Sequence, residues 1–110
     1  MKNMMDIMGM MKKAQAVQSQ MTVVQNKMEN TEFTGEAANG AVQVTMTGKF
    51  KATKIKLEPS VVDPTDIETL EDLLLVAMND AKQKADDATE KAFESIKKGL
   101  NLPDNFKLPF

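Results

Sequence analysis

The sequence contains no cysteine, histidine, tryptophan or tyrosine in its 110 residues. Without cysteine there is no disulfide and no thiolate nucleophile, and without histidine the usual ligand set for zinc, copper and haem is lost. Ser-His-Asp and Cys-His catalysis are likewise excluded. Proton transfer would depend on carboxylates, lysines and hydroxyls, and no Asp/Glu pair stands out from the charged surface around it. We therefore expect no enzyme, no metal site and no cofactor.

Arginine is absent as well, so all 14 basic residues are lysines. The net charge of −2 combines two unequal halves: residues 1–57 have a balance of +4 and residues 58–110 a balance of −6. A lysine meets a phosphate as a flexible point charge, whereas an arginine offers a bidentate fork. If the chain binds a polyanion, this composition favours contacts that tolerate any sequence.

Long apolar runs are also missing. The apolar stretch at residues 4–11 is interrupted by Asp6 and closed by Lys12 and Lys13. It fits neither a signal peptide, whose charge comes first, nor a helix long enough to span a bilayer. We expect a cytoplasmic protein without a membrane segment.

The chain has the size of one domain, and we expect a single unit over residues 1–110. Residues 1–30 predict a helix of roughly 40 Å at 1.5 Å per residue. Eight of the ten methionines lie in residues 1–28. An apolar heptad stripe runs along this helix, which indicates a packing surface. Its members are Ile7, Met10, Ala14, Val17, Met21, Val24 and Met28.

Residues 31–58 change to β-branched and aromatic residues at period two, which predicts a three-stranded antiparallel meander. The strands are expected at residues 32–36, 41–47 and 49–57. In the middle strand Val42, Val44 and Met46 share one face, which is typical of a half-buried strand. The third strand changes parity between Ala52 and Ile55, so we expect a bulge near Thr53 or an edge position.

Residues 64–98 predict a second long helix, with Asp63 as N-cap, Pro64 at the first helical position and Gly99 after the end. Its N-terminal half is rich in leucine and should lie in a core. The half after Ala81 is mostly charged and should project. Residues 99–110 form a tail with Leu102, Phe106, Leu108 and Phe110, which should dock on another surface. The fold class is α+β, and helices this long for so small a domain indicate a homodimer.

Two features have both a functional and a structural interpretation. The methionine-rich helix suits an adaptable partner surface, because methionine repacks easily, but the periodicity of its stripe favours a dimer seam or ordinary core packing. The lysines of the third strand and its turn could contact DNA phosphates, or they could protect a sheet edge from aggregation.

The order of the elements, together with several short segments, resembles the YbaB/EbfC family of bacterial nucleoid-associated proteins. The resemblance covers nearly the whole chain, and each segment is weak alone. The segments are Met8–Gln15, Thr34–Glu36 with Gly40–Val44, Gly48, Leu57–Val62, Glu71–Leu74, Ala77–Ala81 and, at the end, Leu102-Pro103 with Phe106–Phe110.

This resemblance implies an α+β homodimer whose sheets and helix bases pack together while long helical arms project. It further implies binding of duplex DNA with little or modest sequence preference, in the nucleoid, with effects on nucleoid organisation and gene expression. The alternative is a chaperone-like adaptor that grips a partner protein with its methionine-rich helices. From charge and position, the expected DNA contacts are Lys12, Lys13, Lys49, Lys51, Lys54, Lys56, Lys82 and Lys84.

Overall fold

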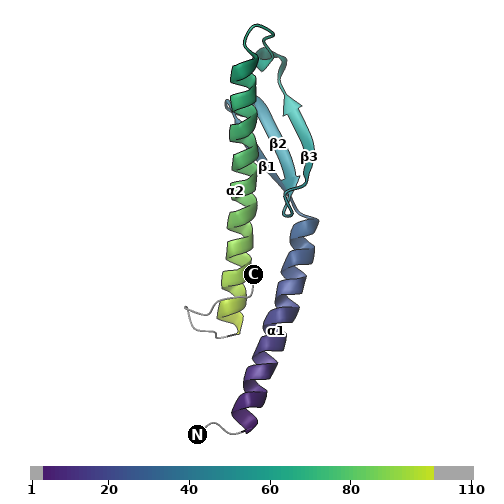
Figure 1. Cartoon of the computed structure of the whole chain (residues 1–110), viewed down its shortest axis with the longest axis vertical. Coiled ribbons are helices and arrows are strands. Elements are labelled where there is room, and N and C mark those ends of the chain that lie inside the picture. The colour runs from purple at the N-terminus through teal and green to yellow at the C-terminus, as the bar shows by residue number, and fades with distance from the viewer. Residues whose placement is uncertain (1–3, 101–110) are drawn as a thin grey trace.

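The computed structural model describes residues 4–100, with side chains from residue 7 onward. It confirms the expected α+β class: a long helix, a three-stranded antiparallel sheet and a second long helix (Figure 1). The molecule measures 73 × 23 × 17 Å, and its radius of gyration is 20.2 Å. A compact domain of this size would have a radius of gyration of about 13 Å. The excess arises because both helices run well past the sheet.

Helix α1 (Met4–Glu29) agrees with the predicted first helix. The residues of its heptad stripe are buried to different extents along the helix. Val17 and Met21 are buried, and Val24 and Met28 are partly buried, whereas Ile7 and Met10 are more than half exposed. Only the C-terminal half of α1 therefore packs within one chain. The N-terminal half extends past the C-terminal end of α2 (Figure 1).

The sheet contains β1 (Glu32–Ala37), β2 (Val42–Thr47) and β3 (Ala52–Leu57) in sequence order. The predicted alternation in β2 is confirmed, with Val42, Val44 and Met46 buried on one face. The turn between β1 and β2 places Ala38 and Asn39 at positive φ, and the Gly40 amide donates to the Ala37 carbonyl. Positive φ at both central residues suits the right-handed twist of a hairpin.

Strand β3 has both features that the sequence predicted as alternatives. It lies at the edge of the sheet, and its register with β2 shifts between Thr45 and Met46. Lys54 pairs with Thr45 and Ala52 with Met46, which leaves Thr53 as the extra residue of a bulge. The bulge returns Ala52 to the same face as Ile55 and Leu57. The strand begins later than expected because residues 48–50 form the hairpin loop.

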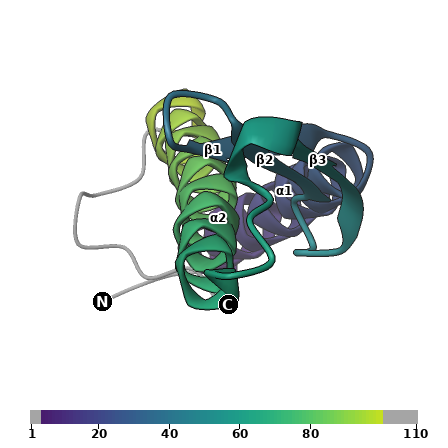
Figure 2. The ribbon, with the colours of Figure 1, turned by 90° about the horizontal axis from the view of Figure 1, so that it is seen from above.

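Helix α2 (Ile67–Gly99) covers the apolar face of β1 and β2. Ala77 and Ala81 are completely buried against this face, next to Val42, Val44 and Met46. Their small side chains let the helix approach closely. A Cβ atom added to Gly35 in β1 would lie 2.0 Å from the Ala77 carbonyl oxygen. β3 lies farthest from α2, as the view from above shows (Figure 2).

The start of α2 differs from the sequence prediction. Asp66, and not Asp63, is the N-cap: its carboxylate accepts from the Thr69 amide at 3.4 Å and from the Thr69 hydroxyl at 2.7 Å. The carboxylate of Asp63 instead accepts hydrogen bonds from the amide and the hydroxyl of Thr65, at 2.9 and 2.7 Å. These two hydrogen bonds hold residues 63–65 in a turn, so Pro64 precedes the helix. A short 3₁₀ helix (Pro59–Val61) connects this turn to β3.

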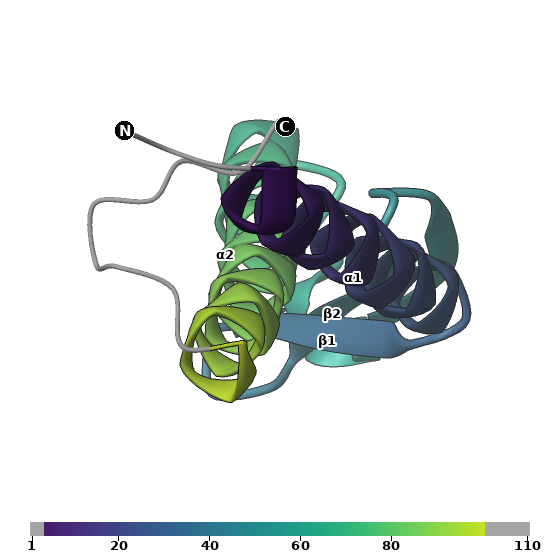
Figure 3. The same ribbon diagram turned by 90° about the horizontal axis from the view of Figure 1, so that it is seen from below.

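The expected division of α2 into a buried base and a projecting arm needs correction. In the first half, Ile67, Leu75, Val76 and Met78 are exposed although Leu70, Leu73 and Leu74 pack on the core. In the second half, Ala85 and Ile96 are buried, and α1 packs alongside this half. Both helices leave the same end of the sheet (Figures 1 and 3). Within the described residues, neither helix has an apolar stretch long enough to cross a membrane. The predicted docking of the C-terminal tail concerns residues 101–110, which lie outside the described residues.

Candidate nucleic-acid interface

The polar face of β3 and the turn before it carry four exposed lysines, which we call the basic edge. Lys54 and Lys56 pair with Thr45 and Gln43 of β2, whose side chains lie on the face away from α2. No acidic residue occurs between Gly48 and Leu57. Because the side chains alternate, the same strand presents Ile55 and Leu57 on the opposite face. The basic edge consists of Lys49, Lys51, Lys54 and Lys56.

The turn between β2 and β3 is anchored on α1. The Gly48 amide donates to the Met28 carbonyl at 2.9 Å, and a Cβ atom on Gly48 would lie 2.6 Å from that oxygen. Lys49 forms an ion pair with Glu29 at the end of α1. Both side chains are substantially exposed, so the pair contributes at most about 1 kcal/mol. Lys49 can therefore exchange Glu29 for a phosphate at little cost.

Lys82 on α2 lies beside this turn. Its Nζ is 3.1 Å from the Asp86 carboxylate and 4.9 Å from the centre of the Phe50 ring. The structure thus brings Lys82 next to the basic edge, although about thirty residues separate them in the sequence. Its pairing with Asp86 offsets part of its charge.

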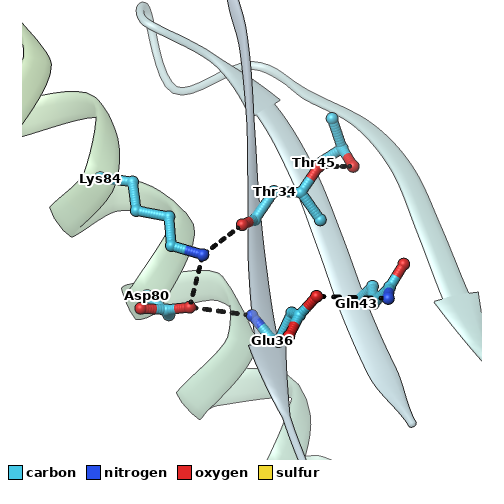
Figure 4. A network of polar contacts seen from close by, with 6 residues as sticks. All are labelled: Thr34, Glu36, Gln43, Thr45, Asp80 and Lys84. Carbon is cyan, nitrogen blue, oxygen red and sulfur yellow. Dashed lines mark hydrogen bonds and ion pairs between the residues drawn. The ribbon is translucent and has the colours of Figure 1, made fainter. Parts of the chain in front are cut away.

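Lys84 faces the other side of α2 and is held by β1 (Figure 4). Its Nζ donates to the Thr34 carbonyl at 2.8 Å and lies 3.3 Å from the Asp80 carboxylate. Asp80 in turn accepts from the Glu36 amide at 3.0 Å. These side chains supply partners for two backbone groups of an edge strand, a structural role that competes with any contact to DNA.

The same network shifts the ionisation of Asp80. The Glu36 amide, which donates to the carboxylate, lowers the pKa of Asp80 below its usual range; partial desolvation opposes this shift, and the hydrogen bond and charge of Lys84 reinforce it. Side chains also connect β1 to β2 on the polar face of the sheet: the hydroxyls of Thr34 and Thr45 lie 2.9 Å apart, and Gln43 donates a hydrogen bond to Glu36 at 3.5 Å (Figure 4).

Lys12 and Lys13 are exposed on the N-terminal half of α1. About sixteen residues of helix separate Lys13 from Glu29, which is roughly 25 Å at 1.5 Å per residue. They form a second basic site, well apart from the basic edge. Of the eight predicted lysines, the structure therefore places four along β3 and the turn before it, sets Lys82 beside that turn, leaves two on the α1 arm and turns Lys84 toward β1.

Phe50, at the centre of the basic group, was missed by sequence reasoning. It has a φ of 65° and is 47% exposed. The available signal was an aromatic residue between two lysines at the start of the predicted third strand, and the unusual backbone conformation is visible only in the structure.

A hollow of about 720 Å³ lies between α1 and α2. Its lining is mainly apolar, including Val24, Met28 and Ile96, and its charged residues are Lys27 and Lys91. It has no paired acid and base. Across the described residues there is also no group of three or more acidic, histidine or cysteine side chains that could hold a metal ion.

Comparison with known proteins identifies the relatives of this chain. Residues 1–100 match the YbaB/EbfC DNA-binding family. The nucleoid-associated protein amb4104 of Paramagnetospirillum magneticum is 48% identical over 107 residues, which cover 97% of this chain and 100% of that protein. The nucleoid-associated protein BQ02190 of Bartonella quintana is 45% identical and covers 97% and 99% of the two chains. A nucleoid-associated protein of Rickettsia felis is 42% identical, with coverage of 91% and 94%.

The fold has a solved counterpart in the uncharacterized protein HP0035 from Helicobacter pylori. The two superpose with a TM-score of 0.64 at 18% identity, over 87% of this chain and 99% of that one. This similarity concerns the fold alone. The sequence match extends over nearly the whole chain and agrees with the predicted resemblance. The chain belongs to the YbaB/EbfC DNA-binding family.

Proposed function

We propose that this protein is a homodimer that binds duplex DNA with little or modest sequence preference and acts in the nucleoid. Its family consists of DNA-binding proteins, and the chain is not an enzyme. The observation that carries the proposal is the basic edge: four exposed lysines within eight residues, on one strand and its turn, without an intervening acid. Lysines on an exposed edge suit phosphates, which position a protein on DNA but do not encode sequence.

The absence of arginine supports weak sequence preference. Direct base reading relies most often on a bidentate arginine contact to guanine, and no such fork is available here. Affinity would come mainly from the release of counterions as lysines neutralise phosphates. Lys12 and Lys13 on the α1 arm and Lys82 beside the turn would extend the contact along the duplex. Lys84 is the weakest candidate because β1 and Asp80 occupy it.

The dimer is proposed from an apolar surface that one chain leaves uncovered, which we call the apolar base. Ile55 and Leu57 lie on the face of β3 that continues the core. On α2, the side chain of Lys82 lies beside Phe50 in the β2–β3 turn. Met78, Leu75 and Ile67 stand four, seven and fifteen residues before Lys82, so they lie on the same side of the helix. Together these residues are Ile55, Leu57, Ile67, Leu75 and Met78, with exposures from 36% to 58%.

A second copy is the occupant that we propose for the apolar base. Its residues extend the buried cluster of Val42, Val44, Ala77 and Ala81 without a break in the sheet, so a matching base would complete one core. The interface would also place two basic edges on one assembly. Two modest patches on one duplex strengthen binding through effective concentration, which compensates for a net charge of −2 per chain.

The adaptor alternative depends on the exposed Met8, Met10 and Met11 of α1. The matches to DNA-binding and nucleoid-associated proteins do not favour it.

If the protein covers DNA in the proposed way, effects on nucleoid organisation and gene expression would follow from that coverage.

The proposed function can be tested by titrating a fluorescent duplex with the protein at about 50 mM and about 200 mM salt. We expect binding at low salt that weakens by at least about tenfold at the higher concentration, because each phosphate contact adds salt dependence. A variant with all four lysines of the basic edge changed to glutamate should lose binding. A control variant changes Lys91, Lys97 and Lys98, which lie away from the basic edge, to glutamate. Its affinity for the duplex should stay closer to that of the unaltered protein. No binding at low salt would overturn the proposal.

A further inference from the structure

Phe50 is held in a backbone conformation that favours glycine. It closes a three-residue hairpin loop, in which its amide donates to the Thr47 carbonyl at 2.8 Å and the Thr47 amide donates to the Lys51 carbonyl at 2.9 Å. Its φ of 65° lies in the left-handed region. Such loops normally place glycine at this position, because a side chain there meets its own backbone. A bulky residue at this position destabilises the fold.

Burial does not explain why a phenylalanine occupies this position. The side chain is 47% exposed, and its ring meets Lys82 in a cation–π interaction at 4.9 Å. Such an interaction is weak at an exposed site. A strained residue with little compensation inside the fold indicates a role outside it, because backbone strain of this kind concentrates at functional positions.

The surroundings of Phe50 are strongly cationic. Lys49 and Lys51 flank it in the chain, and Lys82 lies over its ring. Of the acids in this neighbourhood, Glu29 and Asp86 are paired with Lys49 and Lys82 respectively, and Glu32 accepts a hydrogen bond from the Thr53 hydroxyl at 2.7 Å. An apolar ring surrounded by cations matches duplex DNA, where apolar base stacks lie behind rows of phosphates. Apolar side chains such as phenylalanine are used in this way, as wedges at base steps in the minor groove.

We propose that Phe50 is a DNA-contacting wedge. Its ring enters the groove and packs against the bases, while Lys49 and Lys51 meet the phosphates on either side. Lys82 holds the ring in the exposed position before DNA arrives. This inference rests on the proposed function, since it assigns a contact within the same DNA-binding surface.

The first test is the affinity of Phe50→Gly for duplex DNA. Glycine accepts the positive φ, so the loop and its lysines keep their positions. We expect affinity to fall by roughly tenfold, in line with removal of one base–aromatic contact, while the slope of affinity against salt stays constant because no lysine is removed. Val76→Ala, which trims another exposed apolar side chain on α2, is the control and should bind as before.

Three results would overturn the inference. They are equal affinity of Phe50→Gly and the unaltered protein, a changed salt slope, and a changed sedimentation coefficient, which would assign Phe50 to the dimer contact. The unaltered protein is titrated in parallel. If it fails to bind, the proposed function fails; if it binds and Phe50→Gly binds equally well, only the wedge fails.

The second test uses the absence of tryptophan and tyrosine. Phe50→Trp gives a protein with a single strong fluorophore at the proposed contact. Duplex DNA should change its emission and protect it from acrylamide quenching. Unchanged emission and quenching at saturating DNA would contradict the wedge. A response to vesicles of anionic phospholipid without a response to DNA would also contradict it, because the ring would then serve a membrane surface.

Discussion

The backbone of Gly35 in β1 lies directly against that of Ala81 in α2: a Cβ atom on Gly35 would come within 2.2 Å of the Ala81 amide nitrogen. The obstructing atoms belong to the backbone, so no side chain can rotate aside. This contact determines how closely α2 approaches the sheet. It thereby also determines which apolar residues of β3 remain uncovered.

Gly35→Ala should destabilise the protein by about 3 kcal/mol or more, because the helix must move away from a core that is otherwise closely packed. Urea unfolding followed by circular dichroism measures the change. Gly9→Ala on α1 is the matched control, since nothing lies within 4 Å of the added Cβ atom, and it should stabilise by about 0.5 to 1 kcal/mol. Equal stability of the two variants would contradict the close approach.

The Asp80 network should make stability fall at acid pH. The folded pKa of Asp80 is lowered chiefly by the Glu36 amide, so its stabilising contribution is complete above its ordinary value near 3.8 and is lost as the pH falls through the lower folded value. Asp80→Asn should show a smaller loss of melting temperature between about pH 6 and about pH 3 than the unaltered protein. Asp72→Asn on the same helix is the control. Parallel curves for Asp80→Asn and the unaltered protein would show that the network contributes no pH dependence.

Lys84 and Lys56 should separate stability from DNA binding. Lys84→Ala removes a donor to the Thr34 carbonyl and a partner of Asp80, so its melting temperature should fall while its DNA affinity changes little. Lys56 is exposed and has no ion pair in the described structure, so Lys56→Ala should do the opposite. Thermal melts and DNA titrations of both variants check this. A large drop in the affinity of Lys84→Ala at unchanged stability would reverse the assignment.

The apolar base predicts where the dimer can be broken. Leu75→Glu alters a side chain that is 58% exposed within one chain, so the fold of the protomer should survive while the dimer dissociates at least about tenfold more readily. Sedimentation equilibrium measures the change. Met8→Glu on the α1 arm, with 54% exposure, is the matched control and should remain dimeric. A dimer of Leu75→Glu as stable as that of the unaltered protein would place the interface elsewhere.

Local patterns in the sequence were sufficient to predict much of the fold. Alternation in residues 42–47 indicated the buried face of β2, and the parity change before Ile55 indicated the bulge at Thr53. The beginning of α2 could not be decided in this way, because Asp63 and Asp66 are both good caps. Thr65 and Thr69 distinguish them, through hydrogen bonds whose geometry depends on the turn itself.

The candidate site was less predictable because it depends on contacts between distant residues. Lys84 and Lys82 are equivalent as charges on a helix, and only the packing of α2 turns one toward Thr34 and the other toward Phe50. The exposure of the apolar base likewise depends on how much of the sheet α2 covers. Periodicity identifies an apolar surface but not the chain that covers it.

The most direct measurement of the central claim is the salt dependence of duplex binding when Lys54 and Lys56 are both changed to glutamine. Each phosphate that a lysine neutralises contributes about 0.9 to the slope of log affinity against log salt. The magnitude of the slope should therefore fall by about 0.9 for every phosphate that the variant no longer neutralises. In a dimer each substitution is present twice, so up to twice as many phosphates lose their lysine as with one chain. Lys91→Gln with Lys98→Gln, on the C-terminal half of α2, should leave the slope unchanged. If instead the Lys54 and Lys56 variant keeps the full slope, DNA does not lie on the basic edge.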